Sequence, residues 1–229
     1  MVKVKVCGLT NLEDLRLAEE LGADFSGFVF YRPSPRFVEP LLVKDLIGQS
    51  SGNTAHIGVF VNAMIDTVRR VYAECGLDIV QLHGDESPEY CAALGLPFWK
   101  ALRIRDMSSL AALERYGPGV FLLEAFVPGA YGGTGHSLDQ DIARRAVAAG
   151  AKIILAGGIS TENLAAAVAL RPWAVDLSSS LEEHPGKKSA EKMRSFFSAW
   201  KDLCNLQKGA STIDIKQRPG GGNKWHRKQ

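Results

Sequence analysis

The sequence predicts an α/β protein that folds as a single (β/α)₈ barrel with short connections. Short runs rich in β-branched and aromatic residues alternate with longer amphipathic stretches eight times before residue 204. Several of the short runs, such as Ile153–Ala156, are continuously apolar, which is typical of parallel strands covered on both sides. Strictly alternating strands and helices form either an open doubly wound sheet or a closed barrel. Eight such units favour the barrel.

Each of the eight units starts with a strand and continues with a helix. We expect strands at Val2–Val6, Phe25–Phe30, His56–Val61, Ile79–Leu82, Phe98–Leu102, Val120–Leu123, Ile153–Ala156 and Ala174–Leu177. We expect helices at Asn11–Leu21, Pro40–Ile47, Ala63–Cys75, Ser87–Leu94, Ser108–Arg115, Leu138–Ala149, Thr161–Leu170 and Lys187–Cys204. Asn11 and Ser87 are residue types that cap helix N-termini, and Gly22 follows the end of the first helix.

Composition excludes several classes of protein. Hydrophobic residues make up 46% of the chain and charged residues 23%, as in ordinary globular proteins. The first six residues alternate charged and apolar side chains, without the apolar centre of a signal peptide, so we expect a cytoplasmic protein without membrane association. The four cysteines show neither a CxxC pair nor zinc-ligand spacing. We therefore expect reduced thiols and no metal site.

The chain changes character after Cys204. Residues 1–204 form the expected barrel domain. Residues 205–229 contain two stretches poor in large apolar residues, Gly209–Thr212 and Pro219–Gly222, and have the composition of a disordered tail. Residues 207–229 hold six basic residues and one acid, Asp214. The remaining chain is mildly acidic, which argues against nucleic-acid binding by the barrel. The tail itself is either a solvated extension or a basic arm for an acidic partner.

Candidate site residues follow the strands, because the active site of this fold lies at their C-terminal ends. Gly157 and Gly158 follow the seventh strand, and Ser178 and Ser179 follow the eighth. Bare backbone amides and hydroxyls in these two loops predict a phosphate site. The alternative for the glycine pair is a plain tight turn.

Three further side chains are candidates for the chemistry. Cys7 ends the first strand beside the expected phosphate site, where positive surroundings would favour a thiolate that acts as a general base. Arg36 follows Ser34-Pro35 and has the planar fork that holds a carboxylate. Glu124 ends the sixth strand and is a candidate acid. The competing interpretations are a buried inert cysteine, a solvated arginine and an uncompensated buried carboxyl.

Six short segments in a fixed order carry a family resemblance. They are Lys5-Val6-Cys7-Gly8-Leu9-Thr10, Ser34-Pro35-Arg36, Gln81-Leu82-His83-Gly84-Asp85-Glu86, Gly132-Gly133-Thr134-Gly135, Ala156-Gly157-Gly158-Ile159 and Asp176-Leu177-Ser178-Ser179. Together they resemble the phosphoribosylanthranilate isomerase family of tryptophan biosynthesis. The likeness spans about residues 3–203 and implies a barrel of the ribulose-phosphate-binding type.

The resemblance implies a cofactor-free Amadori rearrangement of a small phosphorylated substrate, by a monomer or homodimer. N-(5-phosphoribosyl)anthranilate would become 1-(2-carboxyphenylamino)-1-deoxyribulose 5-phosphate. Glu124 would protonate the furanose oxygen, Cys7 would remove the C2 proton, and Arg36 would hold the anthranilate carboxylate. The loops with Gly157-Gly158 and Ser178-Ser179 would hold the phosphate. Asp176 would contact ribose hydroxyls, and His83 belongs to the binding pattern without an assigned chemical step.

The chain departs from the family pattern at three places. Glu124 stands where the family has aspartate, Leu138-Asp139-Gln140 replaces Phe-Asp-Trp, and Ser180 replaces a glycine. A positive φ at that glycine would make Ser180 strain the loop. These changes keep a second hypothesis open, a non-catalytic phosphosugar-binding barrel. A third hypothesis is an isomerase of an aminoimidazole phosphosugar. That chemistry uses two aspartates at strand ends, so Cys7 and Glu124 fit it poorly.

Overall fold

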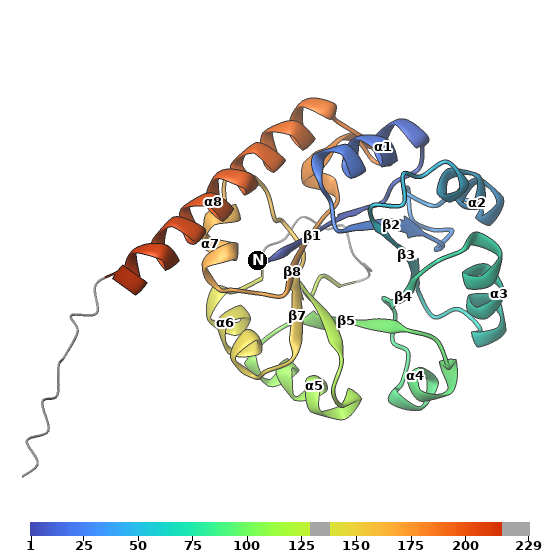
Figure 1. Ribbon diagram of the computed structural model, residues 1–229. Helices are drawn as coiled ribbons and strands as arrows, with labels where there is room; N and C mark the ends of the chain where they lie inside the picture. Colours follow the sequence, from blue (N-terminus) through green and yellow to red (C-terminus); the bar gives the residue numbers. More distant parts are fainter. Residues whose placement is uncertain (129–137, 217–229) are drawn as a thin grey trace, which may run out of the picture.

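The computed structural model describes the backbone of residues 1–128 and 138–216, and side chains as far as residue 205. Eight parallel strands form a closed barrel in sequence order, and helices surround it (Figure 1). The strands are β1 (Lys3–Cys7), β2 (Phe25–Val29), β3 (Ala55–Phe60), β4 (Ile79–Leu82), β5 (Phe98–Ile104), β6 (Val120–Ala125), β7 (Lys152–Leu155) and β8 (Ala174–Leu177). The predicted (β/α)₈ barrel is confirmed.

The surrounding helices follow the strands in the predicted order, and their boundaries change most at α8. They are α1 (Leu12–Leu21), α2 (Pro40–Gly48), α3 (Ile65–Cys75), α4 (Pro88–Leu94), α5 (Ala111–Tyr116), α6 (Gln140–Ala148), α7 (Leu164–Ala169) and α8 (Ala190–Lys216). Short 3₁₀ turns, η1 (Met107–Leu110) and η2 (Ser179–Leu181), precede α5 and follow β8. Asn11 caps α1 by accepting a hydrogen bond from the Asp14 amide at 2.9 Å, and Gly22 ends that helix with φ 96°, as expected.

The register of β1 determines which of its side chains reach the barrel interior. Val4 and Val6 belong to the large cluster between the sheet and the helices. Lys5 and Cys7 lie on the opposite face, inside the barrel. Lys5 is paired in register with Asp176 where β1 meets β8 and closes the barrel.

An apolar cluster fills the part of the barrel interior that lies away from the C-terminal ends of the strands. Its buried members are Phe25, Ile57, Trp99, Ala101, Leu122, Ile154, Ala156 and Ala174. The rings of Phe25 and Trp99 meet edge to face with centroids 4.9 Å apart, a favourable aromatic geometry. Within the described part of the chain, this filled interior directs a site toward the C-terminal ends of the strands.

The segment before α8 differs from the prediction of a helix from Lys187. Residues Glu182–His184 (β9) and Lys187–Lys188 (β10) form an antiparallel hairpin, and α8 begins only at Ala190. Pro185 and Gly186 lie in the turn, which is where these residue types are favoured. The Ser189 hydroxyl then accepts a hydrogen bond from the Lys192 amide at 3.3 Å and caps the helix.

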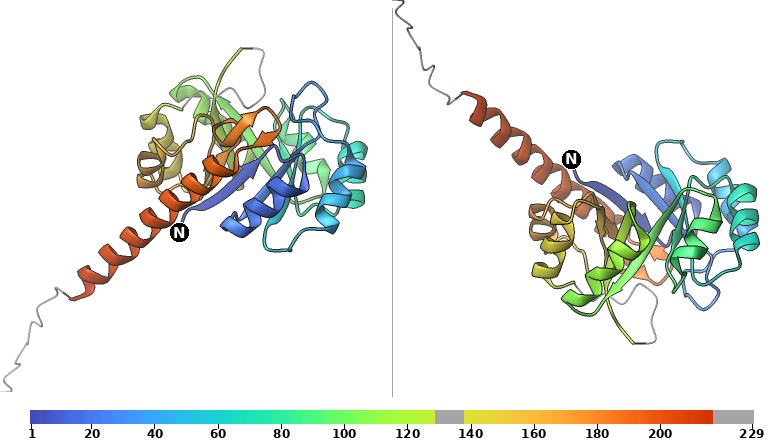
Figure 2. Two further views of the ribbon diagram at one scale, coloured as in Figure 1. Left: turned by 90° about the horizontal axis from the view of Figure 1, so that it is seen from above. Right: turned by 90° about the horizontal axis from the view of Figure 1, so that it is seen from below.

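The far end of α8 also differs from the prediction. The helix continues past Cys204 to Lys216, so that its last turns extend away from the barrel (Figures 1 and 2). A single glycine, Gly209, costs a helix interior about 1 kcal/mol, which is too little to end it. The predicted tail thus begins inside this helix, and its residues 217–229 lie outside the described part of the chain. Among the described helices, none is long and apolar enough to cross a membrane.

Candidate active site

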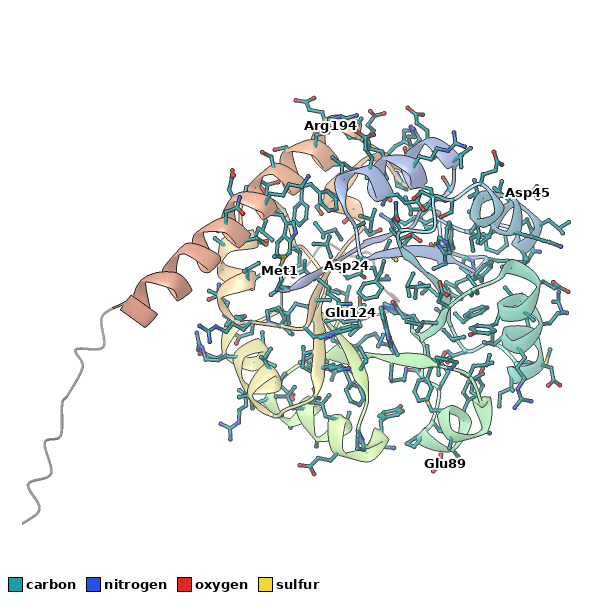
Figure 3. The ribbon with its side chains drawn as sticks, viewed as in Figure 1. Met1, Asp24, Asp45, Glu89, Glu124 and Arg194 are labelled. Carbon is teal, nitrogen blue, oxygen red and sulfur yellow. The ribbon has the colours of Figure 1, made fainter. Side chains whose placement is uncertain are left out.

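A cavity of about 290 Å³ opens at the C-terminal ends of the strands. Nine predicted site residues line it together, namely Cys7, Arg36, His83, Glu124, Gly157, Gly158, Asp176, Ser178 and Ser179. Glu124 lies near the centre of the ring of strands in the view down the barrel (Figure 3). The structure therefore gathers residues that are up to 172 positions apart (Cys7 to Ser179) around one hollow. The predicted Gly132–Gly135 loop falls outside the described residues.

Glycines and serines form one wall of the cavity. Gly157 and Gly158 adopt φ values of 79° and 63°, in the left-handed region that side chains other than glycine rarely enter. The Asn163 side chain donates to the Gly158 carbonyl at 2.7 Å and holds this turn. Ser178 occupies the N-cap position of the 3₁₀ turn η2 without a capping hydrogen bond from its side chain, and Ser180 within that turn has an ordinary negative φ. The replacement of glycine by Ser180 therefore does not strain the loop.

Cys7 lies beside a buried cation. The Lys5 ammonium forms an ion pair with Asp176 at 2.9 Å. A side chain at Gly27 would come within 2.9 Å of the Cys7 Sγ and 3.1 Å of the Lys5 Nζ, so this glycine makes room for both. Burial raises the pKa of the Cys7 thiol, and Lys5 and Lys188 oppose that effect without overcoming it. The expectation that the surroundings as a whole favour a thiolate is not met in the folded barrel, because burial outweighs the nearby cations.

Glu124 lies inside β6, one residue before its end, and joins a buried hydrogen-bonded chain. Its Oε1 is 3.0 Å from Nε2 of His83, and Nδ1 of His83 is 2.7 Å from Nε2 of Gln81. An amide nitrogen only donates, so Nδ1 accepts and the ring proton sits on Nε2, facing Glu124. The Gln81 Oε1 is buried without a partner among the described residues. The Gln81 side chain, which carries this oxygen, lines the cavity.

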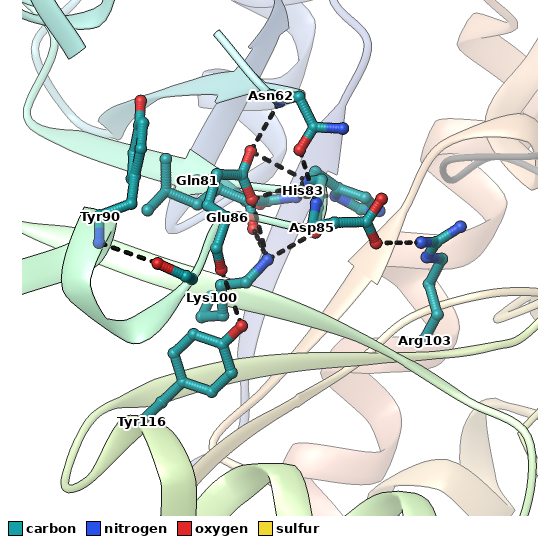
Figure 4. A network of polar contacts seen from close by, with 12 residues as sticks. Asn62, Gln81, His83, Asp85, Glu86, Tyr90, Lys100, Arg103 and Tyr116 are labelled. Atoms are coloured by element: carbon teal, nitrogen blue, oxygen red, sulfur yellow. Dashed lines mark hydrogen bonds and ion pairs between the residues drawn. The ribbon is translucent and has the colours of Figure 1, made fainter. Parts of the chain in front are cut away.

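The loop that carries His83 is held by a second buried ion pair (Figure 4). The Lys100 ammonium lies 2.9 Å from Glu86 and donates to the carbonyls of Leu82 and Gly84, on either side of His83. Glu86 also accepts from the Gly84 amide at 3.0 Å. Both partners are almost wholly buried. The backbone position of His83 is therefore set by β5 as well as by its own strand.

Arg36 is neither solvated nor free to rotate. Its Nε and Nη2 donate to the two carboxylate oxygens of Glu182, at 2.8 and 2.7 Å. Sequence reasoning missed Glu182, Lys188 and Lys5, which are charged residues in the interior. For Lys5 a signal existed, since it lies two positions before Cys7 and so on the same strand face. For Glu182 and Lys188 the only local signal was the Pro185-Gly186 turn.

Comparison with protein families decides between the open hypotheses. Residues 4–199 match the family model described as N-(5'phosphoribosyl)anthranilate (PRA) isomerase. The chain belongs to this family. The match covers most of the chain, from β1 into α8, so the family resemblance of the six segments is confirmed. The match supports the isomerase hypothesis and gives no support to the hypothesis of a non-catalytic barrel.

Individual members of the PRA isomerase family agree with this assignment. The N-(5'-phosphoribosyl)anthranilate isomerase of Pelobacter propionicus is 48% identical over 197 residues, covering 86% of this chain and 94% of that protein. A crystal structure of the isomerase with reduced 1-(o-carboxyphenylamino)-1-deoxyribulose 5-phosphate is 32% identical, with a TM-score of 0.80, covering 88% and 100% of the two chains. Monomers derived from the dimeric Thermotoga maritima enzyme are 31% identical, with a TM-score of 0.77 and the same coverage.

Proposed function

We propose that this barrel converts N-(5-phosphoribosyl)anthranilate to 1-(2-carboxyphenylamino)-1-deoxyribulose 5-phosphate, with Glu124 as the acid and Cys7 as the base. The observation that carries the proposal is that Cys7 on β1 and Glu124 on β6 line the same cavity as the Gly157-Gly158 turn and the Ser178-Ser179 loop. An aldose–ketose conversion on a phosphosugar needs one proton donor, one proton acceptor and an anion site.

The first step assigned to Glu124 is the opening of the sugar ring. Its carboxylic acid form donates a proton to the furanose oxygen as the bond from that oxygen to C1 breaks. The nitrogen lone pair forms the C1–N double bond, which gives an open-chain Schiff base. The His83 N–H beside Glu124 then stabilises the carboxylate that the transfer leaves behind.

The second step is assigned to Cys7. Its thiolate removes the proton from C2, and the electrons move into the C1–C2 bond and onto nitrogen to form an enolamine. That enolamine becomes the ketone when the C2 hydroxyl loses its proton and C1 gains one. Lys5 lies beside the thiol, so its ammonium favours the thiolate each time the base must form.

The two ends of the substrate would be held by different groups of the cavity. The backbone amides of the Gly157-Gly158 turn and the hydroxyls of Ser178 and Ser179 suit a phosphate. Arg36 suits the anthranilate carboxylate. Asp176, which accepts a hydrogen bond from Lys5, would in turn accept from ribose hydroxyls. We keep the cytoplasm as the expected location, and a monomer or homodimer as the expected assembly.

The roles are tested by Cys7→Ala, which removes the base and leaves the cavity otherwise intact. We expect turnover to fall at least about 100-fold while the reduced product analogue still binds. Cys91→Ala is the matched control, because Cys91 is equally buried but lies on α4, and it should keep near-normal turnover. Near-normal turnover by Cys7→Ala would remove Cys7 as the base.

A further inference from the structure

Glu182 is a buried carboxylate that the proposed mechanism leaves without a task. It opens the β9 strand, directly after the 3₁₀ turn that carries the serine loop, and it is 5% exposed. Its two oxygens accept from Nε and Nη2 of Arg36, as a parallel bidentate pair. Burial pushes the pKa of this carboxyl upward, but the hydrogen bonds from Arg36 and Lys188 outweigh burial and hold the pKa below its ordinary value. Glu182 is therefore an anion in the folded protein.

Among the described residues, the pair with Glu182 leaves one edge of the Arg36 guanidinium for a ligand. A guanidinium has five N–H donors, arranged as a side edge of Nε with one terminal nitrogen and an end edge of the two terminal nitrogens. Glu182 takes the side edge. The Arg36 side chain, which carries this end edge, lines the cavity and is 12% exposed. This edge can still donate two parallel hydrogen bonds to a second carboxylate.

Arg36 reaches this position over a glycine. A side chain at Gly8 would come within 2.6 Å of Cδ of Arg36 and 3.2 Å of the Ser178 hydroxyl oxygen. Gly8 also has a φ of 76°, which disfavours other residues. The arginine stem therefore runs across the end of β1, next to Cys7, and Glu182 holds its far end.

Glu182 is itself fixed from the other side. The buried Lys188 ammonium lies 3.0 Å from Glu182 and donates to the Ser178 carbonyl at 3.1 Å. The Gly186 amide donates to the same Glu182 oxygen at 3.3 Å. Lys188 thus joins the carboxylate that holds Arg36 to the loop that carries Ser178. A rigid arginine loses less side-chain entropy on binding than a free one.

We propose that Glu182 is a positioning residue for carboxylate recognition, which holds the side edge of Arg36 so that its end edge faces the anthranilate carboxylate. The inference rests on the proposed function, because it takes Arg36 as the group that binds that carboxylate. Glu182 does not touch the substrate in this account. It acts by fixing the direction of the guanidinium.

The test compares two ligands on each variant. One is reduced 1-(o-carboxyphenylamino)-1-deoxyribulose 5-phosphate, and the other is the same compound without the ring carboxylate. Calorimetry gives the dissociation constant of each ligand. The dissociation constant without the ring carboxylate, divided by that with it, reports carboxylate recognition alone. A fraction of unfolded protein leaves this ratio unchanged. The variants are Glu182→Gln, Arg36→Ala and a control, Glu183→Gln, which changes the exposed neighbouring residue of the same hairpin.

We expect Glu182→Gln to reduce the ratio about 10- to 100-fold, since it removes the charge that aligns Arg36 while keeping the size of the side chain. Arg36→Ala should reduce it at least as far, and Glu183→Gln should leave it within twofold. An unchanged ratio in Glu182→Gln, with a reduced ratio in Arg36→Ala, would overturn this inference and leave the proposed function intact. An unchanged ratio in Arg36→Ala would overturn the assignment of Arg36 itself.

Discussion

The imidazole Nε2 of His83 lies 3.0 Å from the carboxylate Oε1 of Glu124, and each of the two side chains is only 7% exposed. The contact reaches from the end of β4 across β5 to β6. Glutamate stands here where the family pattern has aspartate, and its longer side chain still lines the cavity. The proposed acid is thus held by a neighbour that donates to it.

Glu124→Gln should remove the proposed acid with little effect on the fold. Glutamine keeps an oxygen that accepts from the His83 N–H, so we expect KM within a few-fold of the wild type. An amide has no proton to give to the furanose oxygen, so kcat should fall about 10²- to 10⁴-fold. Steady-state kinetics measures both constants. Retention of more than a tenth of wild-type kcat would exclude Glu124 as the acid.

The pH dependence of the free enzyme should report Cys7. The base acts as a thiolate, and burial raises the pKa of this thiol above its ordinary value of 9.0. Below that pKa the thiolate fraction falls tenfold for each pH unit. Because the acid form of a carboxyl becomes scarcer as the pH rises, kcat/KM does not follow the thiolate alone. We therefore expect the thiolate to be read directly, from the rate of alkylation by iodoacetamide in the wild type minus that in Cys7→Ala, and this rate should still rise beyond pH 9. An alkylation rate that levels off below pH 9 would contradict the raised pKa of Cys7.

Ser180→Gly restores the residue of the family pattern, yet we expect no gain from it. Ser180 has an ordinary φ in a 3₁₀ turn, so glycine relieves no strain and makes the unfolded chain more flexible. The free energy of unfolding should fall by about 0.5–1 kcal/mol in urea titrations. Gly158→Ser is the converse change, at φ 63°, and should cost about 1–2 kcal/mol and raise KM. A more stable Ser180→Gly protein would show that the loop is strained after all.

Lys100→Met should destabilise the barrel. The change leaves Glu86 buried without its partner at 2.9 Å and leaves two carbonyls next to His83 without their donor. Breaking a buried ion pair from one side costs about 3–5 kcal/mol, which urea denaturation resolves easily. The exposed Lys201 on α8 provides the matched control, Lys201→Met, with an expected change below about 0.5 kcal/mol. Equal effects of the two substitutions would mean that the buried pair adds no stability.

The sequence predicted the barrel well because its signals are local. Several strands are short apolar runs, helices such as α1 begin and end at capping residues (Asn11 and Gly22), and parallel strands put their C-terminal ends on one side. Residues placed after different strands, such as Cys7 and Ser178, could therefore be assigned to one site without knowledge of any contact between them.

The interior charges could not be predicted in the same way. Glu182 meets Arg36 across 146 positions of sequence, and nothing near either residue indicates the other. The predicted helix start at Lys187 is wrong, because the Pro185-Gly186 turn makes residues 182–188 a hairpin. The raised pKa of Cys7 likewise depends on how deeply the site is buried, which the order of residues does not show.

The most direct test of the account is turnover of freshly generated phosphoribosylanthranilate, followed as the loss of its anthranilate-type fluorescence, by the wild-type protein and by Glu124→Asp. We expect the wild-type protein to consume the substrate, which would establish the isomerase and show that glutamate serves as its acid. Turnover by Glu124→Asp alone would contradict that role for Glu124. No turnover by either protein, with substrate that a known isomerase consumes, would contradict the proposed function.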